Sequence, residues 1–300
     1  MSEYVKFFAG RVRRRNEPRG IPEGHAVPQE EARDAWDRHG ETERMLSLGH
    51  AAVEFRLGGR TILVDPFLGQ VAGPGPFGPK RFAPPGLSVH HLPPIDTLLI
   101  THNHYDHLDA GTIARIPRKD RVEVIVPLGL GSFFSGAGFK RVVESDWYDE
   151  VSVADVTVTA LPAIHWSKRG LADECRSLWS GYALSSESYR LYFSGDTGFG
   201  PVFDEIGSRL GGFDLGLAGI GAYEPRAVMR ASHATPEEAV GILQAVRAER
   251  VMGMHWGSIV LSDEDPFEAP ERFGRAAMEN GIRDDAILRP RIAETVLLTR

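Results

Sequence analysis

From residue 45 onward, short apolar runs alternate with polar turns at the spacing expected for β-strands. Runs at 51–57 and 61–64, separated by Gly58 and Gly59, predict a β-hairpin. Other apolar or alternating runs predict strands at 95–100, 122–126, 151–161, 178–185, 189–194, 213–220, 250–254 and 293–299. Helical spacing predicts helices at 110–116, 201–210, 236–246 and 266–280. This order of elements favours two packed sheets with helices outside.

The first 44 residues differ from the rest, because they are rich in Arg, Glu, Pro and Gly and contain few apolar residues. We expect an arm at 1–44, packed on the domain or partly flexible, followed by one domain at 45–300. In an alternative interpretation, an anionic membrane surface is contacted by Val5, Phe7 and Phe8, which lie beside several arginines. The Pro- and Gly-rich segment 68–94 predicts a long loop of functional type.

Composition narrows the class of protein. With 300 residues, of which 42% are hydrophobic and 25% charged, the chain can bury a sizeable core. The net charge of -7 argues against a broad nucleic-acid-binding surface. Cys175 is the only cysteine, so an internal disulfide is excluded, and the sequence contains neither a signal-peptide core nor an apolar run long enough for a membrane span. We therefore expect a cytoplasmic protein. If the N-terminal arm contacts a membrane, that contact would be peripheral and at the inner membrane face.

The densest polar cluster is THNHYDHLD at 101–109, directly after the predicted strand at 95–100. Alternate residues of an extended chain project to the same side, so His102 and His104 can bind one ion, while Asp106 and His107 at the following turn can reach a second. Imidazole and carboxylate suit zinc and neighbouring transition metals. Asp109 is the expected N-cap of the next helix. The alternative is a polar loop whose histidines bond to one another, but so dense a set of metal-ligand types favours a metal site.

Three further ligand-type residues follow predicted strands, namely His165, Asp196 and His255. Singly, the histidines could be core residues packed on neighbouring tryptophans, and Asp196 could cap a glycine turn. Together with the 101–109 motif, they predict a site for two metal ions.

These motifs resemble the metallo-β-lactamase superfamily, whose HxHxDH core the chain contains at 102–107. The closest resemblance is to N-acyl phosphatidylethanolamine-hydrolysing phospholipase D and its bacterial relatives, from about residue 48 to beyond 257. The stretches that carry it are LGHAAV at 48–53, LVDP at 63–66, GPKRF at 78–82, VPLGL at 126–130, GDTG at 195–198, IGAYEPR at 220–226 and HWG at 255–257.

The resemblance implies an α+β fold, an αββα sandwich of two mixed β-sheets flanked by helices, with two zinc ions between the sheet edges. One ion would be bound by His102, His104 and His165, and the other by Asp106, His107 and His255, with Asp196 bridging them. Iron or manganese would also suit such a mixed donor set. Dimers are common among the relatives, so a homodimer is a further expectation.

The resemblance also assigns residues around the metals. Asp65 would orient a ligand histidine, although it could instead serve a strand-end turn, and His233 would face the substrate as a general acid, although it could be an ordinary helix-start residue. With Asp106, these two form the predicted catalytic set. The predicted substrate-binding residues are His50, Arg81, Tyr223 and Arg226.

The function expected from these residues is phospholipase D-type hydrolysis of N-acyl phosphatidylethanolamine or a related phosphodiester, with two Zn²⁺ as cofactors. Three alternatives remain: a metal-dependent hydrolase of another ester such as a lactone, a nuclease of the same superfamily, and a binding module without catalysis. The net negative charge argues against nucleic acid as a partner, and the presence of a ligand residue at all seven positions argues against the binding module.

Overall fold

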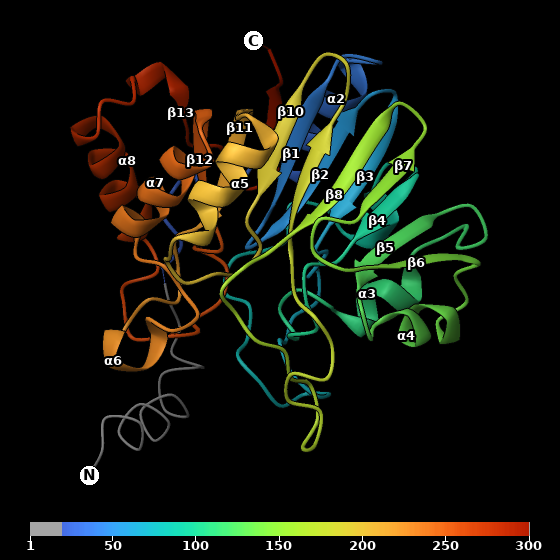
Figure 1. Ribbon diagram of the computed structural model, residues 1–300. Coiled ribbons are helices and arrows are strands. Elements are labelled where there is room, and N and C mark those ends of the chain that lie inside the picture. The colour runs from blue at the N-terminus through green and yellow to red at the C-terminus, as the bar shows by residue number, and fades with distance from the viewer. Residues whose placement is uncertain (1–19, 300) are drawn as a thin grey trace.

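The computed structural model describes residues 20–299, which form two facing seven-stranded sheets (Figure 1). The first sheet has, in spatial order, β14 (Thr295–Leu297), β1 (Arg44–Gly49), β2 (Ala52–Leu57), β3 (Arg60–Val64), β4 (Thr97–Leu99), β5 (Glu123–Pro127) and β6 (Arg141–Ser145). Pairing is antiparallel from β14 to β3 and parallel from β3 to β6.

The second sheet repeats this mixture. Its spatial order is β13 (Ile287–Leu288), β12 (Ala248–Met254), β11 (Phe213–Gly219), β10 (Arg190–Phe193), β9 (Gly181–Ser185), β8 (Val156–Leu161) and β7 (Glu150–Val153). Strands β10 to β13 are parallel, and β7 to β10 are antiparallel.

Helices cover both outer faces, so the predicted αββα sandwich is confirmed. Helices α2 (Gln29–Arg38), α3 (Ala110–Arg115) and α4 (Gly131–Gly136) contribute to the core outside the first sheet. Helices α5 (Val202–Leu210), α7 (Pro236–Ala245) and α8 (Ala269–Glu279) cover the second sheet (Figure 1). The short elements are α6 (Arg226–Met229), η1 (Val89–His91) and η2 (Asp284–Ala286).

Alternation along the strands divides the side chains between these cores. In β2, Val53, Phe55 and Leu57 point between the sheets, whereas Ala52 faces the helix-covered side. Local signals place the helices. Asp109 accepts a hydrogen bond from Gly111 N, as predicted for an N-cap, and Thr235 begins α7 in a capping box.

The observed elements differ from the predicted ones where periodicity is weak. The run at 151–161 is not one strand but the β7–β8 hairpin, which turns at Ala154 with a φ of 52°. Strand β1 was missed because all six of its residues are buried and show no alternation, and β6 because it is a sheet edge with exposed positions. Helix α2 was missed because only Ala32 and Trp36 of its ten residues are buried.

In the part of the arm that the structure describes, residues 20–43, Val27, Ala32 and Trp36 join the core outside the first sheet. The suggested membrane residues Val5, Phe7 and Phe8 lie outside the described residues. Between residues 20 and 299, none of the helices has the length and apolar character needed to cross a bilayer. The loops that follow β3, β4, β8, β10, β11 and β12 gather at one end of the sandwich, where the site lies.

Candidate metal centre

Three histidines from two loops converge at the end of the sandwich. His102 Nε2 lies 2.9 Å from His104 Nδ1, and His165 Nε2 lies 3.2 Å from the same atom. Four-coordinate zinc with bonds of about 2.0–2.1 Å to nitrogen places neighbouring ligand atoms about 3.3 Å apart. The three nitrogens therefore have a spacing that suits one shared cation.

A second group lies beside the first. His107 Nε2 and His255 Nε2 are each 3.2 Å from Asp196 Oδ2, and they are 3.8 and 3.4 Å from Asp106 Oδ2. Asp196 Oδ2 is also 3.9 Å from the Nε2 atoms of both His102 and His165. One carboxylate oxygen therefore stands between the two groups, and the structure brings together all seven residues that the sequence suggested as ligands.

Several donor atoms of the cluster are buried and have no hydrogen-bond partner. Their chemistry shows whether the cluster fits metal ions. His107 Nε2, His255 Nε2 and Asp196 Oδ1 are inaccessible to solvent and make no hydrogen bond within the described chain. Such atoms cost free energy unless something binds them. Nitrogen and carboxylate donors at this spacing fit two transition-metal ions of the zinc type.

The pKa values of the histidines also suit the binding of a cation. Burial lowers the pKa of His165 to about 3 and that of His104 to about 4, so these rings are neutral ligands near pH 7. Burial also lowers the pKa of His255, but Asp196 and Asp106 outweigh this effect and raise it to about 9. The carboxylates thus draw positive charge to the position that a cation would occupy.

Two further side chains, Asp65 and His50, form hydrogen bonds with residues of the cluster. Asp65 accepts hydrogen bonds from His107 Nδ1 at 2.7 Å and from Thr101 N at 2.8 Å, so it lies where it can orient His107. His50 Nε2 lies 3.0 Å from Asp106 Oδ2, and its ring centroid is 4.0 Å from that of His255. His50, Asp65 and His255 all have positive φ values, of 59°, 44° and 64°. Strained backbone of this kind is concentrated at functional sites.

A cavity of about 610 Å³ opens above the cluster. Asp106, Asp196 and His165 contribute to its floor, and most of the wall is apolar. The lining residues that the sequence analysis did not name individually as site residues are Ala72, Pro79, Tyr105, Trp166, Ala222, Val228, Met229, Ala231, Ser232 and Leu261. Tyr105 and Trp166 adjoin ligand residues in the sequence, which was the available signal, whereas no pattern marked Met229 or Leu261.

His233 lines this cavity, and its Nδ1 lies 4.0 Å from Asp196 Oδ2. Burial lowers the pKa of His233 to about 3, so the ring is neutral near pH 7. Arg226 supports the His233 backbone, because its Nη1 donates to the His233 carbonyl at 2.7 Å and its Nη2 pairs with Glu238 at 2.8 Å. Arg226 therefore holds a cavity residue and does not itself line the cavity.

The other suggested substrate-binding residues also lie outside the cavity lining. Arg81 is buried, donates to the carbonyls of Phe67 and Gly69, and stacks on the Phe67 ring at 4.5 Å. Arg81 therefore stabilises the start of the loop at 68–94 by hydrogen bonds to backbone carbonyls. Tyr223 is fully buried in the core outside the second sheet, and the Arg272 guanidinium lies 4.8 Å from its ring centroid. His50 lies against the cluster, where it contacts Asp106, His107 and His255.

Sequence comparison identifies related proteins. Residues 60–256 match the beta-lactamase superfamily domain. The chain is 39% identical over 235 residues to N-acyl-phosphatidylethanolamine-hydrolyzing phospholipase D 1 of Caenorhabditis elegans, an alignment that spans 74% of this chain but only 66% of that protein. It is 28% identical over 251 residues to a metal-dependent hydrolase of Methanopyrus kandleri, covering 82% of this chain and 96% of the relative.

Solved structures share the fold. A metallo hydrolase from Ignicoccus hospitalis superposes with a TM-score of 0.62 at 19% identity, over 85% of this chain and 97% of the other. A diiron beta-hydroxylase from Streptomyces venezuelae superposes with a TM-score of 0.64 at 24% identity, over 86% and 54% of the two chains. The proteins with this fold named here thus include metal-dependent hydrolases and one diiron enzyme. The sequence match over most of the sandwich, together with the two seven-stranded sheets, places this chain in the metallo-β-lactamase superfamily.

Proposed function

We propose that this protein is a metal-dependent phosphodiesterase that cleaves N-acyl phosphatidylethanolamine, or a closely related phospholipid, in the phospholipase D sense. The observation that carries the proposal is the arrangement of seven donor residues beneath a large cavity with mostly apolar walls. Identity of 39% to a phospholipase D with this substrate supports it. A pair of zinc ions, when bound, supplies a nucleophile near neutral pH and stabilises negative charge on phosphoryl oxygens.

The chain's own residues then perform four tasks. Asp65 and His50 fix the orientation of His107 and Asp106, so that the donor atoms are held in place before substrate binds. The cavity wall excludes water around the scissile group. His233, neutral in the free protein, donates a ring N–H hydrogen bond to an oxygen of the phosphodiester. It can act as a general acid for the leaving alkoxide once the substrate's negative charge raises its pKa.

The acyl chains would lie along the apolar wall, where Met229, Leu261 and Trp166 provide contact area. Two exposed side chains lie in loops near these wall residues in the sequence. Phe77 is 74% exposed in the loop between the cavity residues Ala72 and Pro79, and Leu171 is fully exposed in the loop that follows Trp166. Exposed apolar groups of this size beside a lipid-sized cavity favour peripheral contact with a membrane surface. We expect such contact from the cytoplasmic side.

A substrate panel tests the proposal. Zinc-loaded protein is incubated in parallel with N-acyl phosphatidylethanolamine in mixed micelles, an aryl phosphodiester, a lactone and single-stranded DNA, and the products are identified by mass spectrometry. We expect N-acylethanolamine and phosphatidic acid from the lipid. Turnover of the lactone alone would assign the site to another ester, and release of nucleotides alone would assign it to a nuclease. Both results contradict the proposal, as does failure to cleave any phosphodiester.

The metal is a separate part of the proposal. We expect zinc, with iron as the competitor, because a diiron enzyme shares the fold and a mixed imidazole and carboxylate set can bind either metal. Elemental analysis after expression in medium supplemented with equal zinc and iron decides between them, since an iron content above the zinc content would contradict the zinc assignment.

A further inference from the structure

Three of the seven donors, His104, Asp106 and His107, lie in one tight turn, which we call the ligand turn (residues 103–108). His107 N donates to the His104 carbonyl at 3.2 Å, so the turn is closed by its own backbone. This bond does not fix where the turn stands relative to His165, which belongs to the loop between β8 and β9. Yet His104 Nδ1 lies 3.2 Å from His165 Nε2, and the donors of a functional site have to be held to within about 0.5 Å. A second set of contacts therefore has to join the two loops.

Arg169, which follows His165 in the same loop, makes this connection. Its Nη1 donates to the Asn103 carbonyl at 3.0 Å and to the Leu108 carbonyl at 2.7 Å. These two bonds use both N–H groups of that nitrogen. Because the carbonyls stand at the two ends of the ligand turn, one guanidinium nitrogen binds the turn on either side of its donors.

The two loops also contact each other through other groups. Tyr105 Oη donates to the Arg169 carbonyl at 2.8 Å, and the Arg169 guanidinium lies 4.0 Å from the centroid of the Tyr105 ring. Lys168 N donates to Asn103 Oδ1 at 2.8 Å. Asp173 Oδ2 accepts a hydrogen bond from Arg169 N at 3.1 Å. The backbone of Arg169 is thus held at both its N–H and its carbonyl, which keeps the guanidinium against the ligand turn.

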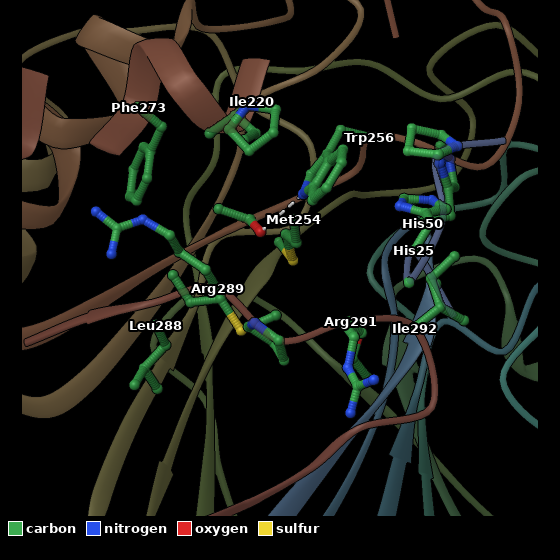
Figure 2. Close-up of a pocket in the computed structure, with 18 of the residues that line it drawn as sticks. His25, His50, Ile220, Met254, Trp256, Phe273, Leu288, Arg289, Arg291 and Ile292 are labelled. Carbon is green, nitrogen blue, oxygen red and sulfur yellow. Dashed lines mark hydrogen bonds between the residues drawn. The ribbon is translucent and has the colours of Figure 1, made fainter. Parts of the chain in front are cut away.

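Near His50 the cluster is supported differently. A cavity of about 230 Å³ lies there, with His50, Met254 and Trp256 in its wall (Figure 2). His50 Nδ1 is buried and has no hydrogen-bond partner among residues 20–299. A cavity supplies no atoms to pack against, so its wall restrains the neighbouring His255 less than a filled core would. Positioning of the donors is therefore left to directed contacts such as those of Arg169.

We infer that Arg169 is a positioning residue of the metal centre. It holds the ligand turn at the distance from His165 at which both ions can bind. The turn supplies His104 to one group of donors and Asp106 and His107 to the other, so Arg169 acts on both sites. It does not line the substrate cavity and therefore acts through the backbone of the turn. The inference rests on the proposed metal centre but is independent of which ester is hydrolysed.

Zinc binding by the full-length protein tests this inference. Competition with a zinc-binding dye measures the affinity, and release of zinc to a chelator measures the dissociation rate. We expect Arg169→Met to weaken zinc binding at both sites by about 10–100-fold, as removal of other partners that orient metal ligands does. Arg169→Lys should lose less, because an ammonium group keeps the charge but cannot stack as a plane on the Tyr105 ring. Tyr105→Phe, which removes only the hydroxyl group, should also lose less than Arg169→Met.

Arg190→Met is the matched control. The Arg190 guanidinium also donates to a backbone carbonyl, that of Leu210, and also lies over an aromatic ring, that of Phe213. Arg190 stands at the start of β10, whereas Asp196 follows the end of that strand. This variant should lose stability in urea unfolding but keep the zinc affinity of the unmodified protein. It therefore separates a general loss of stability from an effect on the donors.

The inference is overturned if Arg169→Met binds zinc as tightly as the unmodified protein, or if Arg190→Met loses affinity by the same factor. If Arg169→Met does not fold, Arg169→Lys and Tyr105→Phe decide, and unchanged affinity in both would contradict the role of Arg169. Two tightly bound ions in both the unmodified protein and Arg169→Met would refute this inference alone. An unmodified protein that binds no zinc would refute the proposed metal centre, and the inference with it.

Discussion

Asp65 and His107 are joined by a hydrogen bond of 2.7 Å between fully buried side chains. The bond fixes Nδ1 of His107, so that Nε2 points at Asp196, 3.2 Å away. Asp65 is itself fastened by Thr101, whose N and Oγ1 lie 2.8 and 2.6 Å from its two oxygens. The turn after β3 thus controls the orientation of a residue from the loop after β4.

Replacing Asp65 with Asn should weaken metal binding, because His107 would lose a charged hydrogen-bond acceptor. The sandwich should still fold. Such supporting partners change metal affinity by about 10–100-fold. Competition with a zinc-binding dye measures the affinity. Asp96→Asn is the control, since Asp96 accepts from Thr61 N at the other end of β3 and is remote from the cluster. Equal zinc affinities in Asp65→Asn and Asp96→Asn would contradict the role given to Asp65.

Arg226 should influence catalysis through His233. Its Nη1 donates to the His233 carbonyl, so Arg226→Met should let the ring move and lower kcat by about tenfold, with a smaller effect on KM. His233→Gln, which removes the proton donor itself, should cost about 10²–10⁴ in kcat. Steady-state kinetics with an aryl phosphodiester measures both. Arg275→Met is the surface control. If Arg226→Met raises KM tenfold and leaves kcat intact, Arg226 acts on substrate binding instead.

Phe77 and Leu171 should matter only when the substrate is in a membrane. The double variant Phe77→Ser/Leu171→Ser should bind anionic phospholipid vesicles several-fold more weakly, because it removes the two most exposed large apolar side chains of residues 20–299. Vesicle sedimentation and hydrolysis of vesicle-borne lipid should both fall, while turnover of a soluble phosphodiester stays unchanged. Met278→Ser, an exposed position on α8, is the control. Equal vesicle binding by both variants would exclude this surface.

Glu54 predicts a pH dependence of stability that is unrelated to the metals. This side chain of β2 is fully buried, and neither carboxylate oxygen has a hydrogen-bond partner among the described residues. Burial raises the pKa of Glu54 from 4.5 to about 8, although Arg33 and Arg44 oppose the shift. The folded state therefore binds a proton that the unfolded state has lost between these pH values. The free energy of unfolding that depends on Glu54 is therefore highest below about pH 4.5 and falls as the pH rises towards 8.

The expected loss for Glu54 is on the order of a few kcal/mol of the free energy of unfolding. Glu54→Gln should remove most of it, because glutamine stays neutral. Urea unfolding at pH 5.5 and 8.5 measures the difference, with Glu30→Gln on the exposed surface of α2 as control. If the parent and Glu54→Gln lose the same stability over this interval, the carboxyl of Glu54 is not the group responsible.

The donor-rich loop at 101–109 was found because its donors directly follow one strong strand pattern. The order of strands and helices predicted two packed sheets with helices outside, which the structure has. His165, Asp196 and His255 were suggested as ligands because each follows a predicted strand, and the structure places all three in the cluster. The predictions were poorest where long-range packing decides. Arg81 and Tyr223 belong to motifs that resemble the phospholipase branch, yet both are buried in contacts that hold loops and core. Met229 and Leu261 reach the cavity only through the fold, so no local pattern marks them.

The central claim is that Asp196 joins two metal sites, and equilibrium dialysis against zinc tests it most directly. The unmodified protein should bind two zinc ions per chain. His165→Ala should retain one, because the group around His107 and His255 remains intact. Asp196→Ala should lose tight binding at both sites, since its Oδ2 lies within 4 Å of donors from both groups. Two tightly bound ions in Asp196→Ala, or a single ion in the unmodified protein, would contradict the account.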